Sequence, residues 1–294
     1  MMKSKSEDLH ILLAVIDTGG FSSAAEQLDL HVTKVSRAVS RIEAGLQTTL
    51  LNRTTRRLEL TQEGREFVSQ VRQGLSTLAH AEETLLNRSG KPRGKLRIDA
   101  ASPFVLHQIV PHVEAFNQEY PDIELELSSH EGYVDLLEHK TDIAIRIGHL
   151  SDSTLHARKL GTSDLYIVAS PGYIAKHGAP ANLSALGEHK LLGFIQSKNL
   201  NYWPLGEGQQ IAPDIASSNG EVIRQLTLSG SGISCLSGFM INEDLKQGRL
   251  VSLFAQAQMQ PSERRNIHAL YYKTSAIARR IEVFLDFIQP RLTL

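Results

Sequence analysis

The chain of 294 residues has little of what a secreted or membrane protein needs. Cys235 is its single cysteine, so intrachain disulfides and cysteine-based zinc clusters are excluded. Its apolar runs, such as residues 11–16, are far too short to span a bilayer, and no apolar signal segment follows Met1. We therefore expect a cytoplasmic protein that makes no contact with a membrane. Cys235 itself lies in the apolar run 232–236, which favours a buried structural thiol over a redox sensor.

Signatures of catalysis are missing as well. The 12 histidines show neither H-x-x-x-H nor H-E-x-x-H spacing, and the chain has no G-x-S-x-G motif and no Walker-type loop. The nearest imitation, residues 230–232 (Gly-Ser-Gly), lacks the lysine of a phosphate loop and the second flanking glycine of a nucleophile elbow. We interpret it as a tight turn after a helix. The sequence thus predicts a protein that is not an enzyme and that uses no metal and no cofactor.

Positive and negative charges nearly cancel over the whole chain, but positive charge is concentrated in one place. The net charge of -1 and the pI near 6.9 argue against nonspecific binding of polyanions by the whole molecule. Residues 31–57, however, carry six basic side chains against Glu43 alone, a local balance of +5. A local and directional positive charge is what steering toward DNA requires.

The same region has the order of a winged helix-turn-helix. Ser22 or Ser23 can cap a first helix, and Ser23 with Glu26 matches the reciprocal S-x-x-E capping box. Residues 29–32 form the predicted turn. The second helix, from Thr33 onward, has one buried apolar stripe at positions i, i+4, i+7 and i+11, namely Val35, Val39, Ile42 and Leu46.

The other face of that second helix is polar, and a leucine-flanked hairpin with an arginine-rich tip at residues 52–57 follows it. A lone basic helix face is usually only solvated. A capped helix, a turn, an apolar-backed basic helix and a basic hairpin in this order favour double-stranded DNA, with the helix in the major groove and the hairpin beside it. The side chains predicted to contact DNA are Ser22, Thr33, Lys34, Ser36, Arg37, Ser40, Arg41, Arg53, Arg56 and Arg57.

Residues 61–88 are predicted to form one long helix with an apolar seam of nearly heptad spacing. The seam can pack on its own domain or pair with the same helix of another subunit, and we favour pairing. A twofold dimer would present two recognition helices about 34 Å apart, which demands a palindromic site. The predicted dimerisation residues are Val68, Val71, Leu75, Leu78 and Leu85.

The DNA-binding segment resembles the LysR-type transcriptional regulators, and the downstream half fits that family too. The matching positions are Phe21, Ser22, Ala24, Ala25, Leu28, Val35, Ser36, Arg37, Glu43, Leu50, Arg53, Leu60, Thr61 and Gly64. Two positions depart from the family pattern: Val32 stands where Gln is usual, and Gln47 stands where Gly is usual. Because Val32 cannot make the base contact of that Gln, we expect Thr33, Lys34 and Arg37 to read the bases.

A hinge-like segment at residues 87–94, rich in Ser, Gly and Pro, separates two parts. We predict a winged helix-turn-helix at 1–61, a linker and dimerisation helix at 62–90 and an effector-binding domain at 91–294. Behind the hinge, strands and helices alternate, which predicts an α/β domain. The expected strands are 96–100, 123–128, 142–147, 166–169, 191–195, 233–236 and 267–272, and the expected helices are 104–116, 133–138, 221–228 and 276–288.

Several polar residues follow strand ends, where open α/β sheets bind ligands. Each of them alone can be a helix cap without ligand contact, but together they favour a ligand cleft. Arg146 is a candidate partner for an anionic effector or a surface salt bridge, and Phe194 and Trp203 can wall the cleft or belong to the core. The predicted effector-binding residues are Ser102, Pro103, Ser128, Ser129, Arg146, Phe194, Asn219 and Gly220.

The resemblance implies that this half is a two-lobed domain similar to periplasmic solute-binding proteins. Lobe I would comprise residues 95–163 and 266–294, and lobe II residues 164–265, with the cleft between them. The expected function is a ligand-responsive transcription factor, a homodimer or homotetramer, that binds a palindromic promoter site, responds to a small organic acid and acts on RNA polymerase. The alternative is a cytosolic solute-binding or sensing protein whose N-terminal helices mediate association.

Overall fold

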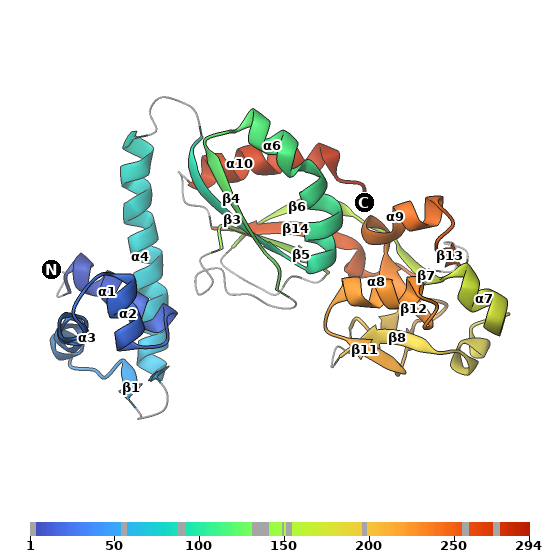
Figure 1. Ribbon diagram of the computed structural model, residues 1–294, viewed down its shortest axis with the longest axis horizontal. Helices are drawn as coiled ribbons and strands as arrows, with labels where there is room; N and C mark the ends of the chain where they lie inside the picture. Colours follow the sequence, from blue (N-terminus) through green and yellow to red (C-terminus); the bar gives the residue numbers. More distant parts are fainter. Residues whose placement is uncertain are drawn as a thin grey trace. The chain divides into compact units, whose positions relative to one another are not determined.

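In a computed structural model, the chain divides into two compact units, residues 1–88 and 89–294 (Figure 1). The structure describes residues 4–53, 58–86, 92–130, 141–148, 150, 155–195, 199–254, 259–272 and 277–294. Helix 133–138, expected from the sequence, lies outside the described residues.

The N-terminal unit is built from helices and one small hairpin. Its helices are α1 (Ser6–Asp17), α2 (Phe21–Gln27), α3 (Val32–Leu46) and α4 (Gln62–Leu86), and its hairpin strands are β1 (Leu51–Arg53) and β2 (Leu58–Leu60). Ala24 and Ala25 of α2 are fully or almost fully buried, and their small side chains let α1 and α3 approach α2 closely. The buried stripe of α3 completes this core with Val35, Val39 and Ile42, as predicted.

Side-chain hydrogen bonds fix the hairpin to the helices on either side. Oε1 of Glu43, in α3, accepts hydrogen bonds from the backbone N–H groups of Leu50 (2.8 Å) and Leu51 (3.2 Å). Oγ1 of Thr61 accepts a hydrogen bond from the N–H of Gly64 at the start of α4. Glu43, the only acidic residue of the basic segment 31–57, therefore has a structural role, because it holds the first strand of the hairpin.

Within the described residues, the C-terminal unit contains two five-stranded sheets of the same plan. The order is β4-β3-β5-β14-β6 in lobe I and β11-β8-β12-β7-β13 in lobe II. Lobe I has β3 (Gly94–Ala100), β4 (Ile123–Ser128), β5 (Ile143–Ile147), β6 (His156–Thr162) and β14 (Asn266–Tyr271). Lobe II has β7 (Leu165–Ala169), β8 (Leu191–Phe194), β11 (Ile215–Ser217), β12 (Ile233–Ser237) and β13 (Val251–Ser252). A separate hairpin pairs β9 (Tyr202–Trp203) with β10 (Gln209–Gln210).

In each sheet the first three strands of the order are parallel to one another. The fourth strand is antiparallel to the third, and the fifth is antiparallel to the fourth. The chain enters lobe II between β6 and β7 and returns to lobe I with β14, so the final strand and helix α10 (Ile277–Ile288) complete the first lobe. A core of buried apolar residues continues from one lobe into the other.

The helix after β3 differs from the prediction of one α-helix at 104–116. It consists of α5 (Ser102–Phe104), the π-helix η1 (Val105–Ile109), the 3-10 turn η2 (Val110–His112) and α6 (Val113–Glu119). Pro111 lacks a backbone N–H and its ring obstructs a regular α-turn before it, which explains the change of helix type.

The remaining helices are α7 (Pro171–His177), η3 (Ser184–Glu188), α8 (Gly220–Leu228), α9 (Gly238–Lys246), η5 (Glu263–Arg265) and η6 (Gln289–Arg291). Of these, α8 and α9 pack on strands of lobe II. After α8, Gly230 adopts a φ of +80°, so residues 230–232 form the predicted turn. Among the described residues, no helix combines the length and the apolar character needed to cross a membrane.

Candidate DNA-binding and effector sites

Helix α3 presents a polar face on an apolar support. Thr33, Arg37 and Ser40 are exposed and Ser36 is half-buried, whereas the opposite stripe is buried. The helix begins at Val32, one residue earlier than predicted, and the side chain of Val32 is 45% exposed at this first position. Hydroxyl and guanidinium groups are therefore available along one side of a rigid helix.

Two of the predicted DNA-contacting cations are engaged with α1. Lys34 Nζ lies 2.9 Å from Oε1 of Glu7, and Arg41 Nε donates to Oδ2 of the buried Asp8 at 3.0 Å. The hydrogen bond from Arg41 holds the pKa of Asp8 below its usual value, although burial opposes it. Arg37 makes no ion pair or hydrogen bond with any described residue. It is thus the cation of α3 that is most available to another molecule.

The predicted capping box of α2 is wrong. Gly20 occupies the N-cap in an extended conformation, and no side chain caps the helix. Helix α2 begins at Phe21, so Ser22 and Ser23 lie inside its first turn and are exposed. Ser22 therefore does not cap the helix, and its side chain lies on the surface of the first turn.

The hairpin has the predicted strands, with Leu51 opposite Leu60 and Arg53 opposite Leu58. Leu50 and Leu51 are buried and Leu58 and Leu60 are half-buried, so one side of the hairpin packs on the domain. Arg53 lies in β1. Arg56 and Arg57, predicted for the tip, lie outside the described residues.

Helix α4 uses part of its apolar seam within its own unit. Val68 and Val71 belong to the core of the N-terminal unit, which corrects their assignment to a subunit interface. Leu75 packs partly against the same core, and Leu78 is 56% exposed. Helix α4 is further tied to α1 by an ion pair between Arg72 and Asp17. The side chain of Leu85 lies outside the described part of the chain.

In lobe I, two predicted effector residues, Ser128 and Arg146, contact a carboxylate that the sequence reasoning missed. Asp99, at the end of β3, is fully buried and accepts hydrogen bonds from Ser128 Oγ (2.9 Å) and Arg146 Nη2 (2.8 Å). Nδ1 of His130 lies 2.6 Å from the Oδ1 atom of Asp99. Arg146 therefore forms a salt bridge, the alternative that the sequence left open, but a mostly buried one. Ser129, next to Ser128, is exposed.

The predicted residues of the two lobes also meet. Nδ2 of Asn219 donates to Oγ of Ser102 at 3.0 Å, and a Cβ on Gly220 would lie 3.0 Å from Cγ of Pro103 and 3.8 Å from Cζ of Phe194. Asn219 caps α8 by accepting hydrogen bonds from the N–H groups of residues 221 and 222. The prediction that Ser102 caps its helix is wrong, because Ala101 occupies the N-cap position.

Two further sequence candidates turn out differently. Trp203 is 2% exposed and lies in the separate core of lobe II, so it does not wall the cleft. Cys235 is buried in the same core, as predicted, and burial raises the pKa of its thiol. Within the described parts of the chain, no three His, Cys, Asp or Glu side chains come together in a way that could hold a metal ion.

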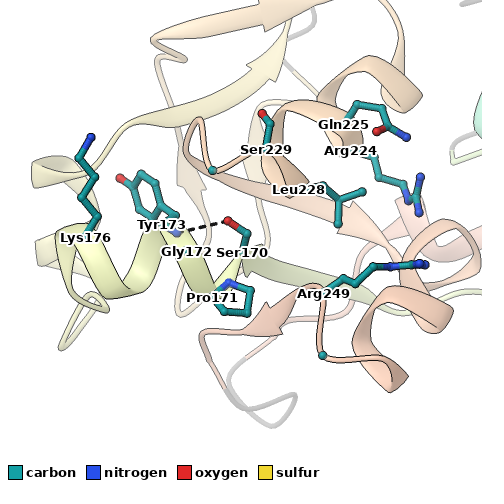
Figure 2. A pocket seen from close by; sticks show the side chains of 12 residues that line it. Ser170, Pro171, Gly172, Tyr173, Lys176, Arg224, Gln225, Leu228, Ser229 and Arg249 are labelled. Atoms are coloured by element: carbon teal, nitrogen blue, oxygen red, sulfur yellow. Dashed lines mark hydrogen bonds between the residues drawn. The ribbon is translucent and has the colours of Figure 1, made fainter.

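A pocket of about 820 Å³ lies in lobe II (Figure 2). It is lined by residues of α7 and α8 and by the turns that follow α8 and α9, and none of the predicted effector residues contributes to it. Figure 2 shows Lys176 on one side and Arg224 and Arg249 on the other, with both guanidinium groups directed away from Lys176. Both arginines form ion pairs with the fully buried Asp244. Arg224 also pairs with Glu221, so two carboxylates face the two guanidinium groups.

Comparison with known proteins agrees with this geometry. Residues 6–65 match the model of the bacterial regulatory helix-turn-helix protein, lysR family, and residues 89–293 match the LysR substrate binding domain. The chain belongs to the LysR family of transcriptional regulators. The family resemblance and the fold class predicted from the sequence are thereby confirmed.

Relatives cover this LysR-type regulator almost completely. It is 43% identical over 296 residues to the HTH-type transcriptional regulator CrgA of Neisseria meningitidis, with 99% of this chain and 98% of that protein covered. The solved structure of CrgA gives a TM-score of 0.65 at 42% identity and covers 99% of this chain and 100% of that one. The full-length structure of the Vibrio cholerae virulence activator AphB gives 0.62 at 29% identity, covering 97% and 98%.

The family settles the general function. The chain is a sequence-specific DNA-binding transcriptional regulator of LysR type with an effector-binding domain, and its relatives are regulators rather than enzymes. LysR-type regulators bind DNA and small-molecule effectors and form oligomers. The alternative of a sensing protein whose N-terminal helices serve only for association finds no support among these relatives.

Proposed function

We propose that α3 is the recognition helix and that Thr33, Arg37 and Ser40 contact base edges in the major groove. The observation that carries this proposal is the exposed polar face of α3, on which Arg37 has no partner among the described residues while Lys34 and Arg41 are paired with α1. A guanidinium group that can donate two parallel hydrogen bonds suits guanine in the major groove. Ser22 and Ser36 flank this face and contact the DNA backbone.

The hairpin supplies the sequence-independent part of binding. Arg53, Arg56 and Arg57 contact phosphate groups beside the major groove, which adds affinity that falls as salt rises. The paired cations Lys34 and Arg41 contribute to the same positive field. Two subunits joined through α4 carry the two recognition helices about 34 Å apart and so select a palindromic promoter site.

The effector is a small organic acid bound where the two lobes meet. Ser102 and Asn219 offer polar groups from opposite lobes, and Arg146, held by Asp99, is the cation among the predicted effector residues. A carboxylate that accepts charge-assisted hydrogen bonds there would favour one lobe arrangement over others. The changed lobe arrangement alters the geometry of the subunits, and this changes the spacing or bending of bound DNA and the access of RNA polymerase.

A titration tests the DNA-binding proposal. A fluorescent duplex from upstream of the chain's own gene is titrated with the protein, and fluorescence anisotropy is compared with that of a scrambled duplex of the same length. We expect tighter binding of the upstream duplex at every salt concentration. Equal affinity for both duplexes would contradict sequence-specific recognition by α3.

The effector site needs its own test. The variant Ser102→Phe fills the place where Ser102 and Asn219 meet, and we expect normal circular dichroism and DNA binding but no effect of organic acids on the DNase I footprint. A folded Ser102→Phe protein whose footprint still responds to the same acid would locate the effector elsewhere.

A further inference from the structure

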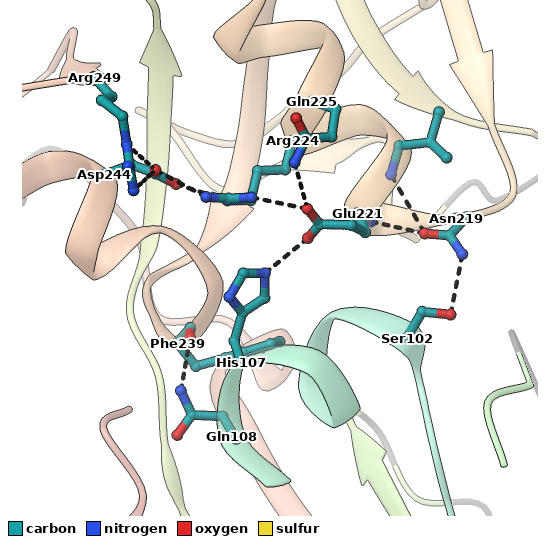
Figure 3. A network of polar contacts seen from close by, with 11 residues as sticks. Ser102, His107, Gln108, Asn219, Glu221, Arg224, Gln225, Phe239, Asp244 and Arg249 are labelled. Carbon is teal, nitrogen blue, oxygen red and sulfur yellow. Dashed lines mark hydrogen bonds and ion pairs between the residues drawn. The ribbon is translucent and has the colours of Figure 1, made fainter. Parts of the chain in front are cut away.

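The start of α8 makes two polar contacts with lobe I (Figure 3). One is the hydrogen bond from Asn219 to Ser102. The other joins Nε2 of His107 to Oε2 of Glu221 at 2.8 Å. His107 and Glu221 are both largely buried, so this contact is shielded from the screening that weakens surface ion pairs.

The lobe I side of this contact is the π-helix η1. His107 and its neighbour Gln108 both contact lobe II from this single turn. His107 contacts Glu221, and Nε2 of the buried Gln108 donates to the backbone oxygen of Phe239 at 2.7 Å. Oε1 of Gln108 accepts a hydrogen bond from the N–H of Thr293 in the C-terminal segment. Turns of π-helix are uncommon and concentrate in functional segments. Here the turn directs two adjacent side chains at the other lobe.

The lobe II side is braced from within. Nη1 of Arg224 donates to Oε1 of Glu221 at 2.8 Å, while Nε and Nη2 of Arg224 donate to the two oxygens of Asp244 at 2.6 and 2.8 Å. Asp244 is fully buried and also accepts from Arg249. Burial raises the pKa of Glu221, but hydrogen bonds from His107 and Gln225 and the charge of Arg224 outweigh it and hold that pKa below its usual value. The carboxylate is thus ionised and held in one orientation.

We propose that Glu221 is a positioning residue that, through His107, fixes how lobe I and lobe II meet beside the effector cleft. Arg224 and Asp244 orient its carboxylate, and their own side-chain hydrogen bonds among the described residues go to residues of lobe II. We call the pair of His107 and Glu221 the latch. Glu221 follows Asn219 by two residues and His107 follows Ser102 by five, so the latch lies at the same two helix starts as the proposed effector cleft. The inference rests on the cleft of the proposed function only for its regulatory meaning, since the latch itself is a property of the free protein.

Hydrogen exchange of the full-length protein without effector or DNA tests the latch. His107→Ala changes lobe I alone, yet we expect amides of residues 219–224, in lobe II, to exchange about ten-fold faster, because a hydrogen bond to a charged group shifts an opening equilibrium by at least this factor. Glu221→Ala should in turn speed the exchange of residues 102–109. The matched controls are His112→Ala, in the same helical segment, and Glu243→Ala, on the exposed surface of α9.

Three further outcomes decide between a latch and two local roles. The double variant should exchange no faster than the faster of the two single variants, because both remove the contact between His107 and Glu221. His107→Gln, which retains a side-chain donor, should restore most of the protection. Effects that stay within the mutated lobe, or that add in the double variant, would overturn the proposal. Because no DNA or organic acid is present, failure of the proposed effector function would leave these results unchanged.

Discussion

Arg146 and Asp99 join the ends of two neighbouring strands of lobe I: Nη2 of Arg146 donates to Oδ2 of Asp99 at 2.8 Å. Asp99 is fully buried, and the Arg146 side chain is only 17% exposed. A buried carboxylate needs such a partner, because its desolvation is otherwise uncompensated. The cation that the sequence suggested for an effector therefore has a structural task as well.

Removing this cation should destabilise the protein strongly. We expect Arg146→Ala to lower the free energy of unfolding by about 3 kcal/mol, because the buried Asp99 would lose its charge partner. Arg97→Ala, on the adjacent strand, removes an arginine that pairs with the exposed Glu126 and should cost less than about 1 kcal/mol. Urea denaturation followed by circular dichroism measures both. Similar losses for the two variants would show that the Arg146 pair is not special.

Most elements of the fold follow from local patterns in the sequence. The apolar stripe of α3 and the period of the strands around residues 98, 125 and 145 require burial on particular faces, and these elements lie within one or two residues of their predicted bounds. The segment after β3 has helical periodicity and was predicted as one α-helix. The π-helix and the 3-10 turn found there were not predictable from that periodicity, because they arise from the local effect of Pro111. The capping box of α2 failed because Gly20 can start the helix without a side-chain cap.

The candidate sites were predictable by region but not by partner. Ser102, Asn219 and Gly220 could be grouped because strand ends and helix starts meet at one edge of each sheet. Asp99, Glu221 and Asp244 were missed because an acidic residue shows no partner in the sequence. The partners Arg146 of Asp99, His107 of Glu221 and Arg224 of Asp244 lie in other elements. Strand 96–100 carries two charged residues, Arg97 and Asp99, and nothing in the sequence shows that only Asp99 is fully buried. The division between paired Lys34 and Arg41 and unpaired Arg37 likewise depends on where α1 packs.

Arg37 and Arg41 should separate DNA recognition from stability. Arg37→Ala should weaken binding to the cognate duplex by about 1–3 kcal/mol with little change in thermal stability, because Arg37 makes no described intramolecular contact. Arg41→Ala should instead lower the Tm, because it leaves the buried Asp8 without its donor. Anisotropy titrations and thermal denaturation of both variants measure the two effects. The assignment fails if Arg41→Ala is the variant that selectively loses cognate binding.

Two glycines of α4 should respond oppositely to alanine. A Cβ on Gly64 would lie 2.2 Å from the backbone oxygen of Leu50, so Gly64→Ala must displace the hairpin and should cost at least about 2 kcal/mol. A Cβ on Gly74 meets nothing within 4 Å, and Gly74→Ala should stabilise the helix by up to about 1 kcal/mol. Chemical denaturation compares them. A neutral Gly64→Ala variant would mean that the hairpin is not fixed to α4 by this close approach.

Gln47 occupies a position where the family usually has glycine, and its φ of +55° is left-handed. Because this conformation costs a residue with a Cβ about 1–2 kcal/mol, Gln47→Gly should stabilise the N-terminal unit by roughly 0.5–1 kcal/mol after the entropy lost by glycine is subtracted. Gln47→Ala should give no gain. Differential scanning calorimetry measures the shift in Tm. A lower Tm for Gln47→Gly would show that the Gln47 side chain makes compensating contacts.

Leu78 is the test of subunit association through α4. Val68 and Val71 are buried in the core of their own unit, so a charge there would unfold the domain and say nothing about assembly. Leu78 is 56% exposed on the same helix, and Leu78→Glu should leave the fold intact while placing a charge in any helix pair that forms there. We expect sedimentation velocity to show smaller species and the affinity for the palindromic duplex to fall by at least about a hundred-fold, since the two half-sites are no longer bound by linked subunits. Gln70→Glu adds the same charge at an exposed position of α4 that lies off the seam, and it should keep the oligomer and the affinity. If Leu78→Glu sediments like the unmodified protein, the subunits associate through another surface.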